Sequence, residues 1–273
     1  MLPTKYMWAI NVFTLELRKY FTYRVDFWVN FLGRLFSVTV VSYFLWKSIF
    51  QYRAVTQIGG YSFSAMILYY LFSPITEKVI IGNEKDNGIS FEIYDGSLSC
   101  YLMYPISFFL YKYVIKLAQS SFMVVQYFIA LGGYLLFFQI PQDVSLSLLG
   151  LIQSIVLALI ASFVYFTLLS LIELSAFWAD NIWSLCVMLR FSTSMLGGIL
   201  IPLTLFPNRI QNIIFYTPFP YFGFIPIQLA MGKLSHALLL EGIVCLFIWE
   251  LVFLFLFYLV WLKGLKKYTG VGI

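Results

Sequence analysis

The sequence predicts an all-α polytopic membrane protein with six transmembrane helices and an amphipathic helix at the membrane interface. Three observations support this prediction: 62% of the 273 residues are hydrophobic, only 11% are charged, and the mean hydropathy is +0.89. A soluble domain carries roughly 25% charged residues, so this chain lacks the polar side chains to cover a water-exposed surface. The three cysteines lie in or beside apolar runs and indicate no disulfide framework. We expect residues 1–273 to form one transmembrane domain.

The first 26 residues mix charged and apolar side chains and lack the pattern of a cleavable signal peptide. On a helix, one stripe is apolar and the charged side chains, among them Arg18, spread around the rest. This pattern indicates an interfacial helix over 1–26 on the cytoplasmic leaflet. Two roles stay open for it: a membrane anchor, or a lever that contacts a cytoplasmic partner. The apolar stripe consists of Ile10, Phe13, Leu17, Tyr20 and Phe21.

Six runs approach the roughly 20 apolar residues that cross a bilayer core of about 30 Å. A tilted or interfacial part with Lys112 and Lys116 is expected just before the third span. The extracytoplasmic loop 206–236 contains four prolines, which disrupt a straight helix, so we expect short helices there. The six expected spans are 27–50, 61–81, 118–138, 146–172, 182–205 and 237–261.

The distribution of basic residues predicts that both termini are cytoplasmic. An even number of spans places the termini on one side, and cytoplasmic segments carry an excess of Lys and Arg. With cytoplasmic termini, the outside holds only Lys47, Arg53, Arg209 and Lys233. The inside then holds Lys5, Arg18, Lys19, Arg24, Lys78, Lys85, Lys112, Lys116, Lys263, Lys266 and Lys267.

Three charged residues lie deep within the expected spans, where charge is costly and often functional. Arg34 and Arg190 are long enough to reach the cytoplasmic headgroups, so anchoring is the favoured interpretation. Glu250 lies near the middle of the sixth span and should be protonated or paired, with Arg190 or Arg34 as its candidate partner. A structural ion pair is favoured over a proton relay. The alternative function is a secondary transporter or channel with Glu250 as its ion-linked group.

The chain lacks the motifs of the common enzyme classes. It contains no GxxxxGK[ST] phosphate loop, no GxSxG elbow and no CxxC pair. Its one histidine, His236, excludes a paired-histidine zinc motif. We therefore expect no catalytic, cofactor-binding or metal-binding residues on this chain. A transporter subunit, a channel, a scaffold or an unusual intramembrane enzyme remains.

Two motifs resemble those of permeases of the ABC type-2 transporter class. The first is an I-x-x-G-x-L-x-x-x-L-x-x-P pattern in the loop before the third span, and the second is a glycine and proline signature at the outer end of the fifth span. The length and the order of the predicted elements are similar to those of this class as well. The first motif uses Ile93, Gly96, Leu98, Leu102 and Pro105, and the second Gly198, Pro202, Pro207, Pro218, Phe219 and Pro226.

The resemblance implies a permease subunit of an exporter in the cytoplasmic (inner) membrane of a bacterium. Such a subunit dimerises with itself or with a second permease and docks two ATP-binding-cassette ATPase subunits, which bind ATP and Mg²⁺. Membrane lipids are the other expected partners, and nucleic acid is not. By this resemblance the N-terminal helix and a cytoplasmic coupling loop, 82–105, transmit motion to the spans. The expected coupling residues are Arg18, Glu92, Ile93, Asp95, Gly96, Leu98 and Pro105.

By the same resemblance, spans two and five face the partner permease and line the path. Small residues such as Gly197 and Gly198 permit close helix contacts, which suit a subunit interface as well as a substrate path. The residues expected at the translocation path or dimer interface are Tyr69, Phe72, Met188, Phe191, Met195, Gly197 and Gly198.

Overall fold

The computed structural model of the protein is built from helices, and its described residues contain no strand beyond an isolated bridge between Ile58 and Tyr61. Lys5, Lys85 and His236, which enter the sequence predictions, lie outside the described residues, as does part of the expected coupling loop. The structure describes residues 7–22, 24–82, 88–234 and 237–270.

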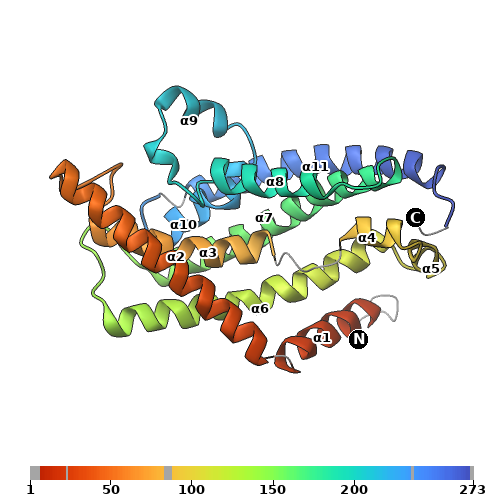
Figure 1. The fold of residues 1–273 in the computed structure, drawn as a ribbon, viewed down its shortest axis with the longest axis horizontal. Helices are drawn as coiled ribbons and strands as arrows, with labels where there is room; N and C mark the ends of the chain where they lie inside the picture. The colour runs from red at the N-terminus through yellow and green to blue at the C-terminus, as the bar shows by residue number, and fades with distance from the viewer. Residues whose placement is uncertain (1–6, 23, 83–87, 235–236, 271–273) are drawn as a thin grey trace.

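Four long helices form the body of the protein. Three of them follow its longest axis, and α2 crosses them obliquely (Figure 1). Each contains an apolar stretch long enough to cross a membrane. These helices are α2 (Arg24–Arg53), α6 (Phe108–Phe137), α7 (Leu148–Glu173) and α11 (Ala237–Leu265).

The third predicted span differs from the expectation, because α6 is one continuous helix of 30 residues. No break therefore separates the part with Lys112 and Lys116 from the expected span 118–138. At 1.5 Å per residue the helix is about 45 Å long, longer than an apolar core of about 30 Å. Its first turns, which carry Lys112 and Lys116, can thus lie outside that core without a break in the helix.

Two of the predicted spans are shorter helices. α3 spans Phe63–Ile80 and continues through Pro74. α8 spans Trp183–Leu196, and its 14 residues correspond to about 21 Å. The single helix expected over 182–205 therefore ends early, at Gly197. Six membrane crossings stay a prediction, because within the described ranges only the four long helices have the length and composition of a span.

The short helix α3 lies at the centre of the protein. It packs against α2, α6, α7 and α10 (Phe224–Ala230), and most of its side chains are buried. The ring of Phe72 stacks on Tyr127 of α6 with a centroid distance of 5.1 Å. Because α3 contacts four other helices, its sequence is constrained on all faces, which explains the absence of a one-sided apolar pattern.

The two ends of the helix bundle carry different elements (Figure 1). Both ends of the described chain lie at the end of the bundle that also carries α1, α4 and α5. The opposite end carries α9 and the loops that follow α2 and α6. The segment 206–236 forms α9, a 3₁₀ turn and α10 within its described part. The remaining short helices are α1 (Met7–Thr22), α4 (Ile89–Tyr94), α5 (Leu98–Leu102) and α9 (Asn208–Ile214).

A polar cluster, the loop clip of Ser62, Asp143 and Lys233, joins three loops at the α9 end. Asp143 accepts hydrogen bonds from the Ser62 backbone at 3.0 Å and from its hydroxyl at 2.7 Å. The Lys233 ammonium donates to Asp143 at 3.1 Å and to the carbonyl of Gly60 at 2.7 Å. Burial acts to raise the pKa of Asp143, but the hydrogen bonds from Ser62 and Lys233 outweigh it, so the pKa lies below the usual 3.8.

Replacing Asp143 with alanine should lower the free energy of unfolding at pH 7 by about 1–3 kcal/mol, because Ser62 and Lys233 lose their acceptor. The lowered pKa means that this stabilisation is present above the unfolded pKa and disappears as the pH falls through the folded pKa. The difference in melting temperature between the variant and the wild type in detergent should therefore shrink as the pH falls below about 4. The matched control Asp180→Ala alters an exposed carboxylate and should change little. Equal melting of Asp143→Ala and wild type at pH 7 would contradict the role of the clip.

Candidate coupling site and translocation elements

The expected coupling loop contains two short helices, α4 and α5, whose inner faces are anchored in the protein. A turn at Gly96 with φ of +77° joins them, a conformation that favours glycine. Ile89, Ile93 and Leu98 are buried in an apolar cluster with Phe177, Phe257 and other side chains of α6, α8 and α11. The outer faces are exposed. Exposed side chains on this segment are Phe91, Asp95, Cys100, Leu102, Met103, Tyr104 and Pro105.

Two polar contacts tie α4 to the long helices. Lys112 of α6 forms an ion pair with Glu92, and both side chains are nearly buried. Burial raises the pKa of the Glu92 carboxyl, although Lys112 acts in the opposite direction. At the end of α7, a Glu173 carboxylate oxygen accepts a hydrogen bond from the backbone of Ile89 at 2.8 Å. A displacement of α4 is therefore resisted by α6 and α7 together.

The end of the chain also holds the coupling segment. The Tyr268 hydroxyl donates to the carbonyl of Gly96 at 2.7 Å, and lies 3.2 Å from the hydroxyl of Ser99. On the other side, the Tyr94 hydroxyl donates to the carbonyl of Ala179 at 2.9 Å. The turn between α4 and α5 is thus fixed to the segment after α11 as well as to the α7–α8 connection.

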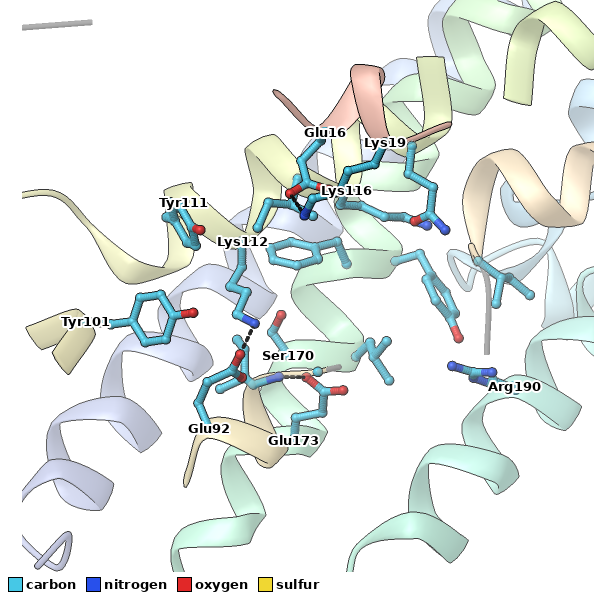
Figure 2. A pocket seen from close by; sticks show the side chains of 18 residues that line it. Glu16, Lys19, Glu92, Tyr101, Tyr111, Lys112, Lys116, Ser170, Glu173 and Arg190 are labelled. Carbon is cyan, nitrogen blue, oxygen red and sulfur yellow. Dashed lines mark hydrogen bonds and ion pairs between the residues drawn. The ribbon is translucent and has the colours of Figure 1, made fainter. Parts of the chain in front are cut away.

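A cavity of about 380 Å³ lies between α1, α4, α6, α7 and α8 (Figure 2). The Glu92–Lys112 pair and Glu173 form part of its wall, with Arg190 on the side away from Tyr101. The predicted coupling residue Arg18 lies exposed on α1, one residue from Lys19, which lines the cavity. The charged side chains around the cavity are Glu16, Lys19, Glu92, Lys112, Lys116, Glu173 and Arg190.

The chain departs from helical geometry after α8, where backbone carbonyl groups turn towards α3. Gly198 has φ of +74°. The Tyr69 hydroxyl donates to the carbonyl of Gly198 at 2.5 Å, and the Ser73 hydroxyl donates to that of Ile199 at 2.8 Å. The Tyr70 hydroxyl donates to the carbonyl of Leu200 at 2.9 Å. Irregular backbone at membrane depth is tolerated where protein groups satisfy it, and α3 supplies those groups here.

The glycines of this break also permit close contact with the following segment. The backbone of Phe224 donates to the carbonyl of Gly197 at 2.7 Å. A β-carbon on Gly197 would lie 3.0 Å from the Phe219 carbonyl oxygen, and one on Gly198 would lie 2.9 Å from Phe224. Gly197 and Gly198 therefore bring α8, the 3₁₀ turn 219–222 and α10 together within one chain.

The residues expected at the translocation path fall into two groups. Tyr69 and Phe72 are fully buried inside the chain, so they present no surface to a path or a second subunit in this conformation. Met188, Phe191 and Met195 of α8 are exposed. The structure thus joins Tyr69 to Gly198 by a hydrogen bond but does not place the whole set on one surface.

Of the charged residues predicted within the spans, Arg34 and Glu250 have partners other than those expected. Arg34 donates to Glu77 of α3 at 2.6 Å. Glu250 accepts a hydrogen bond from the Thr167 hydroxyl at 2.7 Å, so the predicted pairing of Glu250 with Arg34 or Arg190 is wrong. Arg190 instead lines the cavity. Among the described residues, no group of three or more His, Cys, Asp or Glu side chains is arranged to hold a metal ion.

A sequence model described as ABC-2 family transporter protein matches residues 36–272. This chain belongs to the ABC-2 family of transporter proteins. The resemblance carried by the two motifs is confirmed, since the matched region contains both the α4–α5 segment and the break after α8. Comparison with curated proteins and with solved structures gives no match.

As an ABC-2 transporter protein, the chain is a multi-pass membrane permease of an ABC-type transporter, and a component of membrane transport. The family match begins within α2, so α1 lies outside it. The packing of α1 against α6 therefore comes from the structure and not from the family assignment.

Sequence reasoning gave no role to Glu173, which closes one side of this site. Its signal in the sequence is a carboxylate at the end of an otherwise apolar helix. The same pattern is typical of a solvated helix end, so it does not predict a contact. The contact with Ile89, 84 residues away, has no local signature. The Lys112–Glu92 pair was likewise missed, because its members lie on different helices 20 residues apart.

Replacing Lys112 with methionine should leave the buried Glu92 carboxylate unpaired, which costs about 3–5 kcal/mol. Burial already raises the pKa of Glu92 in the folded chain above its unfolded value. The stability that Glu92 contributes is therefore present below the unfolded pKa and falls as the pH rises through the folded pKa. The loss should therefore be larger at pH 8 than at pH 5 in thermal unfolding. A double variant that also carries Glu92→Gln should recover part of the lost stability. Lys266→Met, at an exposed lysine of the same end, should melt as wild type; equal losses in the two lysine variants would contradict the buried pair.

Replacing Ser73 with alanine should leave the Ile199 carbonyl without its donor, at a cost of about 1–3 kcal/mol. Ser37→Ala is the matched control, because the exposed Ser37 hydroxyl bonds the carbonyl of Gly33 within its own helix. Melting temperatures of the two variants in detergent provide the test. If Ser73→Ala melts no lower than Ser37→Ala, the break does not depend on the α3 hydroxyl.

Proposed function

We propose that this chain is the membrane permease subunit of an ATP-driven exporter, and that it forms the translocation path with a second permease subunit. Separate ATP-binding-cassette subunits bind ATP and Mg²⁺ and dock on the α4–α5 segment. One observation carries this proposal: the outer face of α4 and α5 is exposed, while the inner face is tied to α6 and α7 by Glu92, Lys112 and Glu173.

The contacts of α4 support a route for motion from an ATPase to the membrane helices. A displacement of α4 acts on α6 through Lys112 and on α7 through Glu173. α7 packs against α11, α10 and α3, so movement of its end reaches the buried break after α8. α1 packs along α6 and offers Arg18 as a further exposed contact at the same end.

The membrane orientation in this proposal rests on the distribution of exposed basic residues. Exposed basic residues gather at the end of the bundle that carries α1, α4 and α5, as expected for a cytoplasmic face. We therefore place this end in the cytoplasm and the loop clip outside, with the protein in a bacterial inner membrane. α8 presents Met188 and Phe191, which suit contact with lipid or with a second permease. The exposed basic residues at the proposed cytoplasmic end are Arg18, Lys19, Lys263, Lys266 and Lys267.

Replacing Met103 with arginine tests the docking surface, because this side chain at the end of α5 is 79% exposed. In membranes that contain the ATP-binding subunits, we expect co-purification of the ATPase and ATP-dependent transport to fall by about tenfold, which corresponds to about 1.4 kcal/mol. Ile213→Arg is the matched control, since Ile213 is 69% exposed on α9 at the opposite end. Both variants should retain the wild-type melting temperature.

Two results would overturn the proposal. One is a Met103→Arg variant that couples to the ATPase as well as Ile213→Arg. The other is transport by the purified chain alone, driven by an ion gradient, which Glu250→Gln would then abolish. The second result would favour the secondary transporter or channel.

A further inference from the structure

The cavity between α1 and α8 carries more positive than negative side chains, and each of its acidic groups already has a partner on at least one oxygen. Four basic side chains and three carboxylates line it. Glu16 pairs with Lys19, Glu92 pairs with Lys112, and Glu173 accepts from Ile89. The carboxylates are thus engaged in the fold, while Arg190 forms no ion pair within the part of the chain that the structure describes.

Besides the Glu92 Oε2 atom, three polar atoms at this cavity are buried without a hydrogen-bond partner among the described residues, and all three are donors. They are the Gln119 amide nitrogen, the Tyr165 hydroxyl and the Arg190 Nε. Gln119 is 2% exposed and Tyr165 is fully buried, and all three residues line the cavity. A buried donor without an acceptor costs about 1–3 kcal/mol, so three of them at one cavity indicate that an acceptor occupies it in the working protein.

The chemistry of these groups selects the kind of acceptor. An amide N–H, a phenol O–H and a guanidinium N–H all donate, and they come from α6, α7 and α8. Donors from several helices around one cavity suit a tetrahedral oxyanion, which offers acceptor oxygens in several directions. Ile115, Phe166 and Leu169 add an apolar wall to the same cavity.

We propose that this cavity binds a phosphate-bearing headgroup, with Arg190, Gln119 and Tyr165 as donors and an attached acyl chain along Ile115, Phe166 and Leu169. The cavity lies beside α1, which the sequence assigns to the membrane interface, and therefore at headgroup depth. A phospholipid and free inorganic phosphate share this chemistry, and the experiment separates them. The proposal uses the membrane placement of the chain but not its coupling to an ATPase.

The test uses the full chain, purified and delipidated in detergent, without any ATPase. Native mass spectrometry should give a dissociation constant for phosphatidylglycerol at least about tenfold below that for diacylglycerol, which lacks the phosphate; a charge-assisted hydrogen bond contributes enough for this ratio. Inorganic phosphate is tested separately by its effect on the melting temperature. Stabilisation by phosphate alone identifies the free ion as sufficient, whereas selective phosphatidylglycerol binding without it identifies the lipid.

Variants locate the site. Arg190→Gln should weaken phosphatidylglycerol binding by about tenfold, while Arg209→Gln, at an exposed arginine on α9, should bind as wild type. Tyr165→Phe removes only the unpartnered hydroxyl, so it should fold as wild type yet bind more weakly. The proposal is overturned if phosphatidylglycerol and diacylglycerol bind equally and phosphate does not stabilise the chain. It is also overturned if Arg190→Gln and Tyr165→Phe both bind like Arg209→Gln. These outcomes leave the ATPase-coupling proposal untouched, because no ATPase takes part.

Discussion

The need to satisfy backbone carbonyl groups inside a membrane protein governs the arrangement of this permease. α8 stops after Leu196, and the carbonyls of the next residues leave the helical pattern. Water is not available in an apolar core, so other parts of the protein must supply donors. Tyr69, Tyr70 and Ser73 of α3 do so. This requirement places α3 in the middle of the bundle and holds the break beside α10, where two glycines permit the close approach.

The same helices connect that break to the charged end of the protein. The chain just after α3 reaches the cavity through Ile81, and α8 reaches it through Arg190. The cavity also adjoins Glu92 and Glu173, which hold α4. α7 contacts α4, lines the cavity and packs against α3 and α8, so these helices connect the docking surface, the cavity and the broken helix. In the proposed exporter, this shared set of helices is the physical basis for linking events at α4 to the membrane core.

Part of this architecture was accessible from composition and local pattern. The scarcity of charge and the long apolar runs predicted a helical membrane protein, and four long apolar helices are present. The motif from Ile93 to Pro105 predicted the family, because it reflects a local turn and helix pattern. The third predicted span and the part before it form one helix, in which Lys112 and Lys116 line the cavity.

The pairing of charges could not be predicted in the same way. Glu250 is a lone carboxylate in an apolar run, and nothing local distinguishes Thr167, 83 residues away, from either arginine as its partner. The sequence by itself determined that the chain folds in a membrane, that it is helical and to which family it belongs, because these properties depend on composition and near neighbours. Only the tertiary structure decided which helix satisfies the broken backbone and which donors meet at the cavity. The contacts at the break join residues more than 100 positions apart, such as Tyr69 and Gly198, and both features depend on how the helices pack.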